Sequence, residues 1–187
     1  MEKELNREEC LLVLKEYTKS ESLLKHAYAV ETCVVAYAKN FGEDVNYWGN
    51  VGLLHDFDYE RFPTAEDHPY KGNEILKELG FSEEFRTAIM SHAEYTGITR
   101  DTKLAKTLFA CDELAGFITA VTYVRPSKSV VDVKVKSVKK KMKDKGFARA
   151  VNREEIIQGA EELGIPLDDH IQFCIDAMKG NKELLGL

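Results

Sequence analysis

The stretch GLLHDFDYERFPTAEDHPYKG, residues 52–72, joins an apolar helix-like segment to a run of histidines and acids. Helical periodicity predicts a helix that begins near Asp44 and ends at about His55. Pro63 ends the regular pattern, because the residue before a proline disfavours the α region. The pair His55-Asp56 is therefore either an ordinary turn after a buried helix or the centre of a metal site.

The same periodicity predicts helices on both sides of this stretch and makes the chain all-α. Capping residues mark two helix starts, with Asn6 before Glu9 and Asn152 before Glu155, and Gly164 marks one helix end. The other helices are expected at about 22–41, 44–55, 70–79, 83–93, 101–120 and 168–179. In the segment after residue 124 a turn leads into a helix that buries Val131, Val135, Val138 and Met142, with a short VKVK strand as the alternative.

Length and composition indicate one domain over residues 1–187, because 44% apolar residues suffice for a core. The net charge of −6 argues against a general nucleic-acid-binding protein, because such proteins usually carry a net positive charge. No signal-peptide-like run opens the chain and no apolar stretch approaches the ~20 residues that span a bilayer, so we expect a cytoplasmic protein without membrane association. The four scattered cysteines are predicted to be reduced core thiols.

Six polar residues fall in or beside the predicted helices, where apolar residues are expected. They are His26, His55, Asp56, His68, His92 and Asp112. Each one alone is more often a hydrogen-bonded structural residue than a ligand, since buried polar groups need only a partner. If the six converge, they form either several separately satisfied polar contacts or one cation site. Neutral imidazoles and carboxylates are the ligands of Zn, Mn, Fe and Ni.

The order of these residues resembles the HD-domain superfamily of metal-dependent phosphohydrolases. His26, the pair His55-Asp56 after GLL, and Asp112 in ACDEL follow the H…HD…D pattern over about residues 22–124. The resemblance implies a compact multi-helix bundle with the metal site between the helices, on which the C-terminal helices of residues 129–180 pack. In that family the first His, the HD pair and the last Asp bind one metal ion.

The HDIG-like subgroup of this superfamily adds two histidines that bind a second ion, bridged by the Asp of the pair. His68 in HPYKGNEIL and His92 in SHAEYTG match those places. The resemblance thus implies one or two divalent ions, drawn from Mn, Fe, Ni, Co, Zn and Mg.

Departures from the subgroup bear on the substrate. HDFDY replaces H-D-I-G-K, and SHAEYTGITR replaces the motif of cyclic-dinucleotide phosphodiesterases, so a cyclic-di-GMP substrate is not supported. HDFDYE keeps Glu60 but has Tyr59 where guanosine-tetraphosphate hydrolases have Glu. The expected substrate is therefore another small phosphoester, with a nucleotide as the favoured class.

The expected chemistry is phosphoester hydrolysis by a hydroxide that the metal activates, because a bound divalent ion lowers the pKa of water toward about 7. Predicted catalytic residues are Asp56, Asp58 and Glu60; for Asp58 and Glu60 a solvated helix end is the alternative. Arg125 and Lys128 in VRPSK are predicted to bind the substrate phosphate, with Lys71 as a weaker candidate. The lysine run of VKSVKKKMKDK is interpreted as a solvated helix face.

Two other functions remain open from the sequence. Some HD-fold proteins are mixed-valent di-iron oxygenases with the same H…HD…H…H…D ligand order. A third hypothesis is a ligand-binding module that does not turn over, although the chain keeps every ligand position. The oligomeric state is left open.

Overall fold

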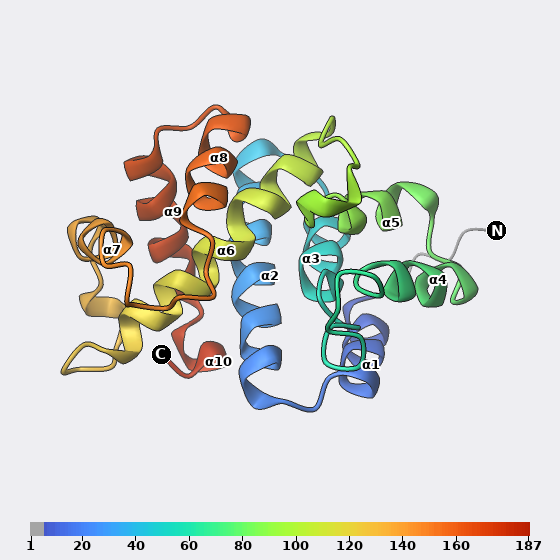
Figure 1. Cartoon of the computed structure of the whole chain (residues 1–187), viewed down its shortest axis with the longest axis horizontal. Helices are drawn as coiled ribbons and strands as arrows, with labels where there is room; N and C mark the ends of the chain where they lie inside the picture. The colour runs from blue at the N-terminus through green and yellow to red at the C-terminus, as the bar shows by residue number, and fades with distance from the viewer. Residues whose placement is uncertain (1–5) are drawn as a thin grey trace.

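The computed structural model describes residues 6–187, and within that range the chain is helical and contains no strand (Figure 1). The α-helices are α1 (Arg7–Tyr17), α2 (Glu21–Phe41), α3 (Val45–Leu54), α4 (Tyr70–Glu78), α5 (Glu83–Met90), α6 (Lys103–Tyr123), α7 (Val135–Met142), α8 (Arg153–Leu163), α9 (Leu167–Gly180) and α10 (Lys182–Leu185). Two short 3₁₀ helices, η1 (Glu94–Thr96) and η2 (Val130–Asp132), complete them. The all-α prediction is confirmed, and the alternative prediction of a short strand at VKVK is wrong.

The helix ends follow the capping residues that the sequence contains. The Asn6 side chain accepts a hydrogen bond from the Glu9 amide at 3.0 Å, and the Glu9 carboxylate accepts one from the Asn6 amide at 3.1 Å. Asn152 caps α8 by accepting from the Glu155 amide at 3.4 Å. Gly164 ends α8 in the left-handed region, with φ of 73°. Both predicted helix starts are therefore confirmed.

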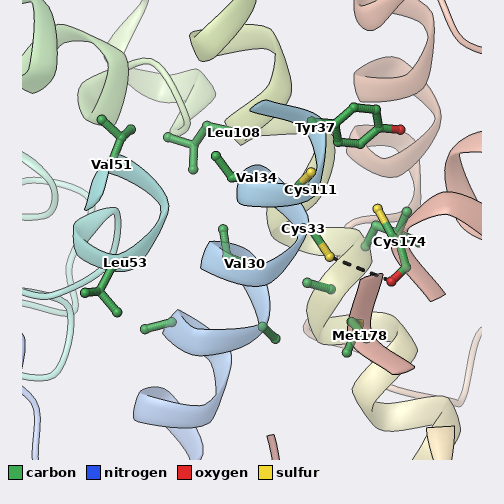
Figure 2. Packing of buried hydrophobic residues seen from close by; sticks show 14 of the residues in the cluster. Val30, Cys33, Val34, Tyr37, Val51, Leu53, Leu108, Cys111, Cys174 and Met178 are labelled. Atoms are coloured by element: carbon green, nitrogen blue, oxygen red, sulfur yellow. Dashed lines mark hydrogen bonds between the residues drawn. The ribbon is translucent and has the colours of Figure 1, made fainter. Parts of the chain in front are cut away.

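Helix α2 lies at the centre of the core and packs against α3, α6 and α9 (Figure 1). Figure 2 shows Val30 and Val34 on the side of α2 toward Val51 of α3, and Cys33 on the side toward Cys174 of α9. All four cysteines are free and buried, as predicted. None of the helices in the described range has the length and apolar character needed to cross a membrane.

Two glycines of α3 allow it to approach α2 closely. A Cβ at Gly49 would lie 2.8 Å from Cγ2 of Val35, and a Cβ at Gly52 would lie 3.2 Å from Cα of Glu31. Any larger residue would push the two helices apart. This close contact brings the end of α3, and with it His55, alongside α2.

The C-terminal helices pack on the same core, with α8 against α6 and α9 against α2. A Cβ at Gly159 of α8 would lie 2.6 Å from Cα of Ala110, so α8 and α6 are also in close contact. Such packing is what one domain over residues 1–187 would require, although the domain assignment itself stays a prediction.

The segment before α7 differs from the prediction. Val131 was expected inside, but its side chain is 50% exposed, whereas Val130 and Val133 are buried. The turn of η2 breaks the helical phase before α7 begins at Val135, so periodicity extrapolated backwards from Val138 selects the wrong residue.

Candidate metal centre

The six polar residues singled out in the sequence come together from separate parts of the chain. His26 lies on α2, His55 caps the C-terminus of α3 and is followed by Asp56, His68 precedes α4, His92 follows α5, and Asp112 lies on α6. Their donor atoms make two groups in which all atoms lie within 4.8 Å of one another. The first group is His26, His55, Asp56 and Asp112; the second group is Asp56, His68 and His92.

In the first group two imidazoles face two carboxylates. Nε2 of His26 lies 3.0 Å from Oδ1 of Asp112, and Nε2 of His55 lies 3.3 Å from the same oxygen and 3.5 Å from Oδ2 of Asp56. The carbonyl of Gly52 accepts a hydrogen bond from Nδ1 of His55 at 2.8 Å. With its proton on Nδ1, His55 turns a buried lone pair toward two anions, and only a proton or a cation makes that arrangement favourable.

In the second group two imidazole nitrogens point at each other. Nδ1 of His68 donates to Oδ1 of Asp58 at 2.8 Å, and Nδ1 of His92 donates to the carbonyl of Ile89 at 2.6 Å. The two Nε2 atoms lie only 3.3 Å apart, and each lies 3.1 Å from Oδ1 of Asp56. Because both Nδ1 atoms carry a proton, both Nε2 atoms of neutral rings present lone pairs at one point. A shared positive charge is required there as well.

The shifted pKa values of these groups also indicate that positive charge stabilises the carboxylates. Burial alone would raise the pKa of Asp56 and Asp112, but the charge of His55 and hydrogen bonds from other histidines hold both well below the usual range. Burial lowers the pKa of His68, yet its hydrogen bonds with Asp56 and Asp58 raise it to about 9. A divalent cation bound to these residues would supply the charge that protons supply otherwise.

Asp56 belongs to both groups through different oxygens. Its Oδ2 lies near His55 and His26, at 3.5 and 3.9 Å, and its Oδ1 faces His68 and His92. Ligands on one ion are separated by about 3 to 3.5 Å when the metal–ligand bonds are ~2.0–2.2 Å. Donor type and spacing therefore fit a divalent ion, and the two oxygens of Asp56 belong to different groups.

The two acids beyond the pair do not face the donor atoms. Asp58 is buried, with one oxygen on His68 and the other accepting from the Gly72 amide at 2.8 Å. Glu60 accepts hydrogen bonds from the amides of Lys19 and Ser20 at 2.7 and 2.9 Å. Asp58 therefore orients His68, and Glu60 caps the N-terminus of α2, so these contacts do not support a direct catalytic role for either.

The contacts of the predicted phosphate-binding residues are with residues outside the two groups. Arg125 comes 13 residues after Asp112, beyond the end of α6, which corresponds to about 20 Å along a helix. Its Nη1 donates to Oγ of Ser137 at 3.1 Å. Lys128 is exposed in the following turn, and Lys71 forms an ion pair with Glu74 at 3.3 Å. Within residues 6–187, no hydrogen bond or ion pair joins these cations to a member of either group, so their role in phosphate binding stays a prediction.

Two further residues escaped the sequence interpretation. Glu113 accepts from the Asn152 amide at 3.1 Å, and burial together with the charge of Asp112 raises the pKa of Glu113 to about 8. Its place directly after Asp112 in ACDEL was the available signal. His170 is the fifth histidine and lies apart from both groups, where Nε2 donates to the Ala110 carbonyl at 2.8 Å and Nδ1 accepts from the Tyr37 hydroxyl at 2.6 Å. Its role is structural.

Comparison with known proteins bears on this arrangement. A family model described as the HD domain matches residues 23–116, which is 94 of the 187 residues and includes all six members of the two groups. No solved structure matches the chain.

Proposed function

The chain belongs to the HD domain family, and from this premise we propose that it is a metal-dependent phosphohydrolase acting on a small molecule, with a nucleotide as the favoured substrate. Members of the family are mostly metal-dependent phosphohydrolases, which supports hydrolase chemistry in general. The nucleotide substrate is the part of the proposal that goes beyond the family. In the proposed reaction the oxygen of water bonds to phosphorus, the ester P–O bond breaks, and the leaving oxygen takes a proton to become an alcohol.

The observation that carries this proposal is the shared carboxylate of Asp56 between two sets of inward-facing imidazoles. One ion would be held by the first group and a second by the second group. Bound divalent ions lower the pKa of water and stabilise negative charge on phosphoryl oxygens. Four histidines and two carboxylates form a nitrogen-rich donor set, which suits Mn, Fe, Co, Ni or Zn better than Mg.

The chain's own residues hold the ligands in place. Asp58 fixes the ring of His68, and main-chain carbonyls fix His55 and His92, in each case by accepting a hydrogen bond from the Nδ1–H group. Each contact leaves Nε2 deprotonated and directed at the shared carboxylate. Asp56 would thus be a ligand common to both groups, and Asp58 has a positioning role.

Elemental analysis followed by a phosphoester panel tests the proposal. We expect up to two divalent ions per purified chain and release of phosphate from at least one substrate. The double variant His55→Ala/Asp56→Ala should keep its helical circular dichroism and lose both metal and activity, whereas Glu60→Gln should keep both. A folded double variant that binds metal and hydrolyses substrates like the wild type would overturn the assignment.

A mixed-valent di-iron oxygenase is the second candidate, because a nitrogen-rich set with a shared carboxylate suits a pair of iron ions equally well. Bound iron with O₂ consumption and no phosphate release would establish it against hydrolysis. A non-catalytic binding module is the third candidate. It would be supported by metal binding without turnover in either assay.

A further inference from the structure

Three exposed tyrosines lie beside the second group. Tyr59, Tyr70 and Tyr95 have exposed fractions of 40%, 38% and 53%. Each follows a member of the second group by two or three residues in the chain, after Asp56, His68 and His92 respectively. We refer to these three side chains as the tyrosine rim.

Direct contacts tie two members of the rim, Tyr59 and Tyr95, to His68. The ring of Tyr59 meets the imidazole of His68 edge to face, with centroids 5.3 Å apart and an interplanar angle of 87°. The Tyr95 hydroxyl donates to the main-chain carbonyl of His68 at 2.9 Å. Partial burial and the negative charge of Asp56 raise the pKa of Tyr95 to about 12, with contributions from the other two rim tyrosines. Two of the phenols thus contact His68 directly, and Tyr70, two residues after His68 in the chain, lies close enough to Tyr95 to influence its pKa.

The rim is not explained by packing of the core. Single exposed aromatic residues are normal on a protein surface, but several gathered at one functional group mark a contact site. Tyr70 begins α4, and neither its hydroxyl nor that of Tyr59 makes a hydrogen bond within residues 6–187. Aromatic faces and two phenolic hydroxyls are therefore available to a ligand.

The surrounding charges indicate what kind of ligand fits. The nearby carboxylates are already engaged, since Asp58 bonds His68 and Gly72, and Glu94 bonds Arg100 at 2.9 Å and Gln158 at 2.8 Å. A ligand with an ammonium group would therefore find no unpaired carboxylate among these residues, whereas a flat aromatic ligand would find aromatic side chains to stack on. Stacking on aromatic side chains contributes about 5- to 150-fold in affinity per base.

We propose that the tyrosine rim binds the nucleobase of a nucleotide whose phosphate lies at the second group. This inference rests on the proposed function and specifies its substrate class. Tyr59, Tyr70 and Tyr95 are then specificity-determining residues, and the two phenolic hydroxyls without internal partners contact the polar edge of the base.

A matched pair of substrates separates binding of the base from binding of the phosphate. The five common nucleoside 5′-monophosphates are compared with ribose 5-phosphate, which lacks only the base. We expect kcat/KM of the best nucleotide to exceed that of ribose 5-phosphate by at least about tenfold. Tyr70→Leu should reduce this ratio about 5- to 150-fold while kcat/KM for ribose 5-phosphate stays within about twofold.

Controls distinguish recognition from structure. Tyr123→Leu removes a tyrosine of similar exposure, 44%, at the end of α6, and should leave the ratio unchanged. Tyr59→Leu should resemble Tyr70→Leu. The proposal is overturned if wild-type protein treats nucleotides and ribose 5-phosphate alike, if choline phosphate is preferred to every nucleotide, or if Tyr70→Leu lowers both rates equally.

A binding measurement keeps the rim testable if no phosphoester is hydrolysed. Saturation-transfer NMR with nucleosides, which carry no phosphate, reports contact with the base independently of metal and turnover. Nucleoside binding that weakens in Tyr70→Leu but not in Tyr123→Leu would support the rim even though the phosphohydrolase proposal had failed. Absence of nucleoside binding together with absence of any base preference would overturn the rim itself.

Discussion

Replacing Asp58 with asparagine is expected to weaken binding at the second group selectively. Asp58 accepts two hydrogen bonds, from Nδ1 of His68 and from the Gly72 amide, both at 2.8 Å. Asparagine has one acceptor and one donor end, so one of these two contacts must be lost in either orientation. If the donor end faces Gly72, a buried amide loses its acceptor. If it faces His68, the ring proton must move to Nε2, the atom directed at Asp56.

The size of the effect follows from the same contacts. A buried donor without an acceptor costs about 1–3 kcal/mol of stability. Loss of the residue that orients a metal-binding histidine costs about 10- to 100-fold in metal affinity, or ~1.4–2.8 kcal/mol. The Kd of the ion at the second group should rise by this factor. Binding at the first group should change by less than about threefold, because its histidines are His26 and His55, and neither of them contacts Asp58.

Calorimetric titration of the metal-free protein with Mn²⁺ and with Zn²⁺ measures both affinities, and circular dichroism confirms folding. The matched control is Glu60→Gln, two residues away, which keeps an acceptor oxygen for the amides of Lys19 and Ser20 and should leave both the fold and the metal affinity unchanged. Asp58→Asn protein that binds both ions with wild-type affinity would refute the reasoning. Equal weakening at both groups would show that Asp58 acts on the whole fold rather than on His68.

Three other changes test the packing and the buried histidine. Gly72→Ala places a Cβ 2.7 Å from Cγ of Asp58, and should cost about 1–3 kcal/mol in urea unfolding and weaken the second-group ion in calorimetry. Gly159→Ala places a Cβ 2.6 Å from Cα of Ala110, and should cost about 1–3 kcal/mol in urea unfolding without changing metal affinity. Burial lowers the pKa of His170, so the neutral imidazole's contribution to stability is present above about pH 6.5 and is lost as the pH falls toward the pKa in the folded protein. The free energy of unfolding in urea should therefore fall between pH 7 and pH 5. His170→Gln should reduce the slope of this fall, by at most ~1.4 kcal/mol per pH unit.

Each of these changes has a control. Gly180→Ala adds a Cβ that meets nothing within 4 Å at the end of α9, and should change stability by less than about 1 kcal/mol. If Gly72→Ala and Gly159→Ala behave like Gly180→Ala, the close-packing argument is wrong. An unchanged pH slope in His170→Gln protein would contradict the assignment of a neutral buried imidazole.

The helices were predictable because their ends depend on neighbours in the chain. Asn6 caps α1, Gly164 ends α8, and the helix expected at about 22–41 is Glu21–Phe41. The helix expected at 83–93 is shorter and ends at Met90. His92 consequently lies in a turn, where its Nδ1 bonds back to the Ile89 carbonyl. Short helix ends depend on such contacts, which periodicity does not contain.

The roles of charged side chains were less predictable than their positions in the chain. Asp58 and Glu60 lie two residues apart, yet one bonds His68 and the other bonds the amides before α2. Arg125 and Lys128 follow Asp112 in sequence, but the length of α6 carries them away from it. Their predicted roles in catalysis and phosphate binding stay predictions without support from these contacts.

The helical pattern and the identity of the six candidate ligands were predictable from the sequence, because both depend on residue type and on spacing along the chain. The family resemblance implied that these ligands form two groups around Asp56, but which oxygen of Asp56 faces which histidines is visible only in the folded chain, since that depends on how the ends of α3 and α5 and the segment before α4 meet. The stretch of residues 52–72 contains both kinds of information. Its HD pair is readable from the sequence, whereas the bond from Asp58 to His68 and the edge-to-face contact of Tyr59 with His68 exist only after the chain folds back on itself.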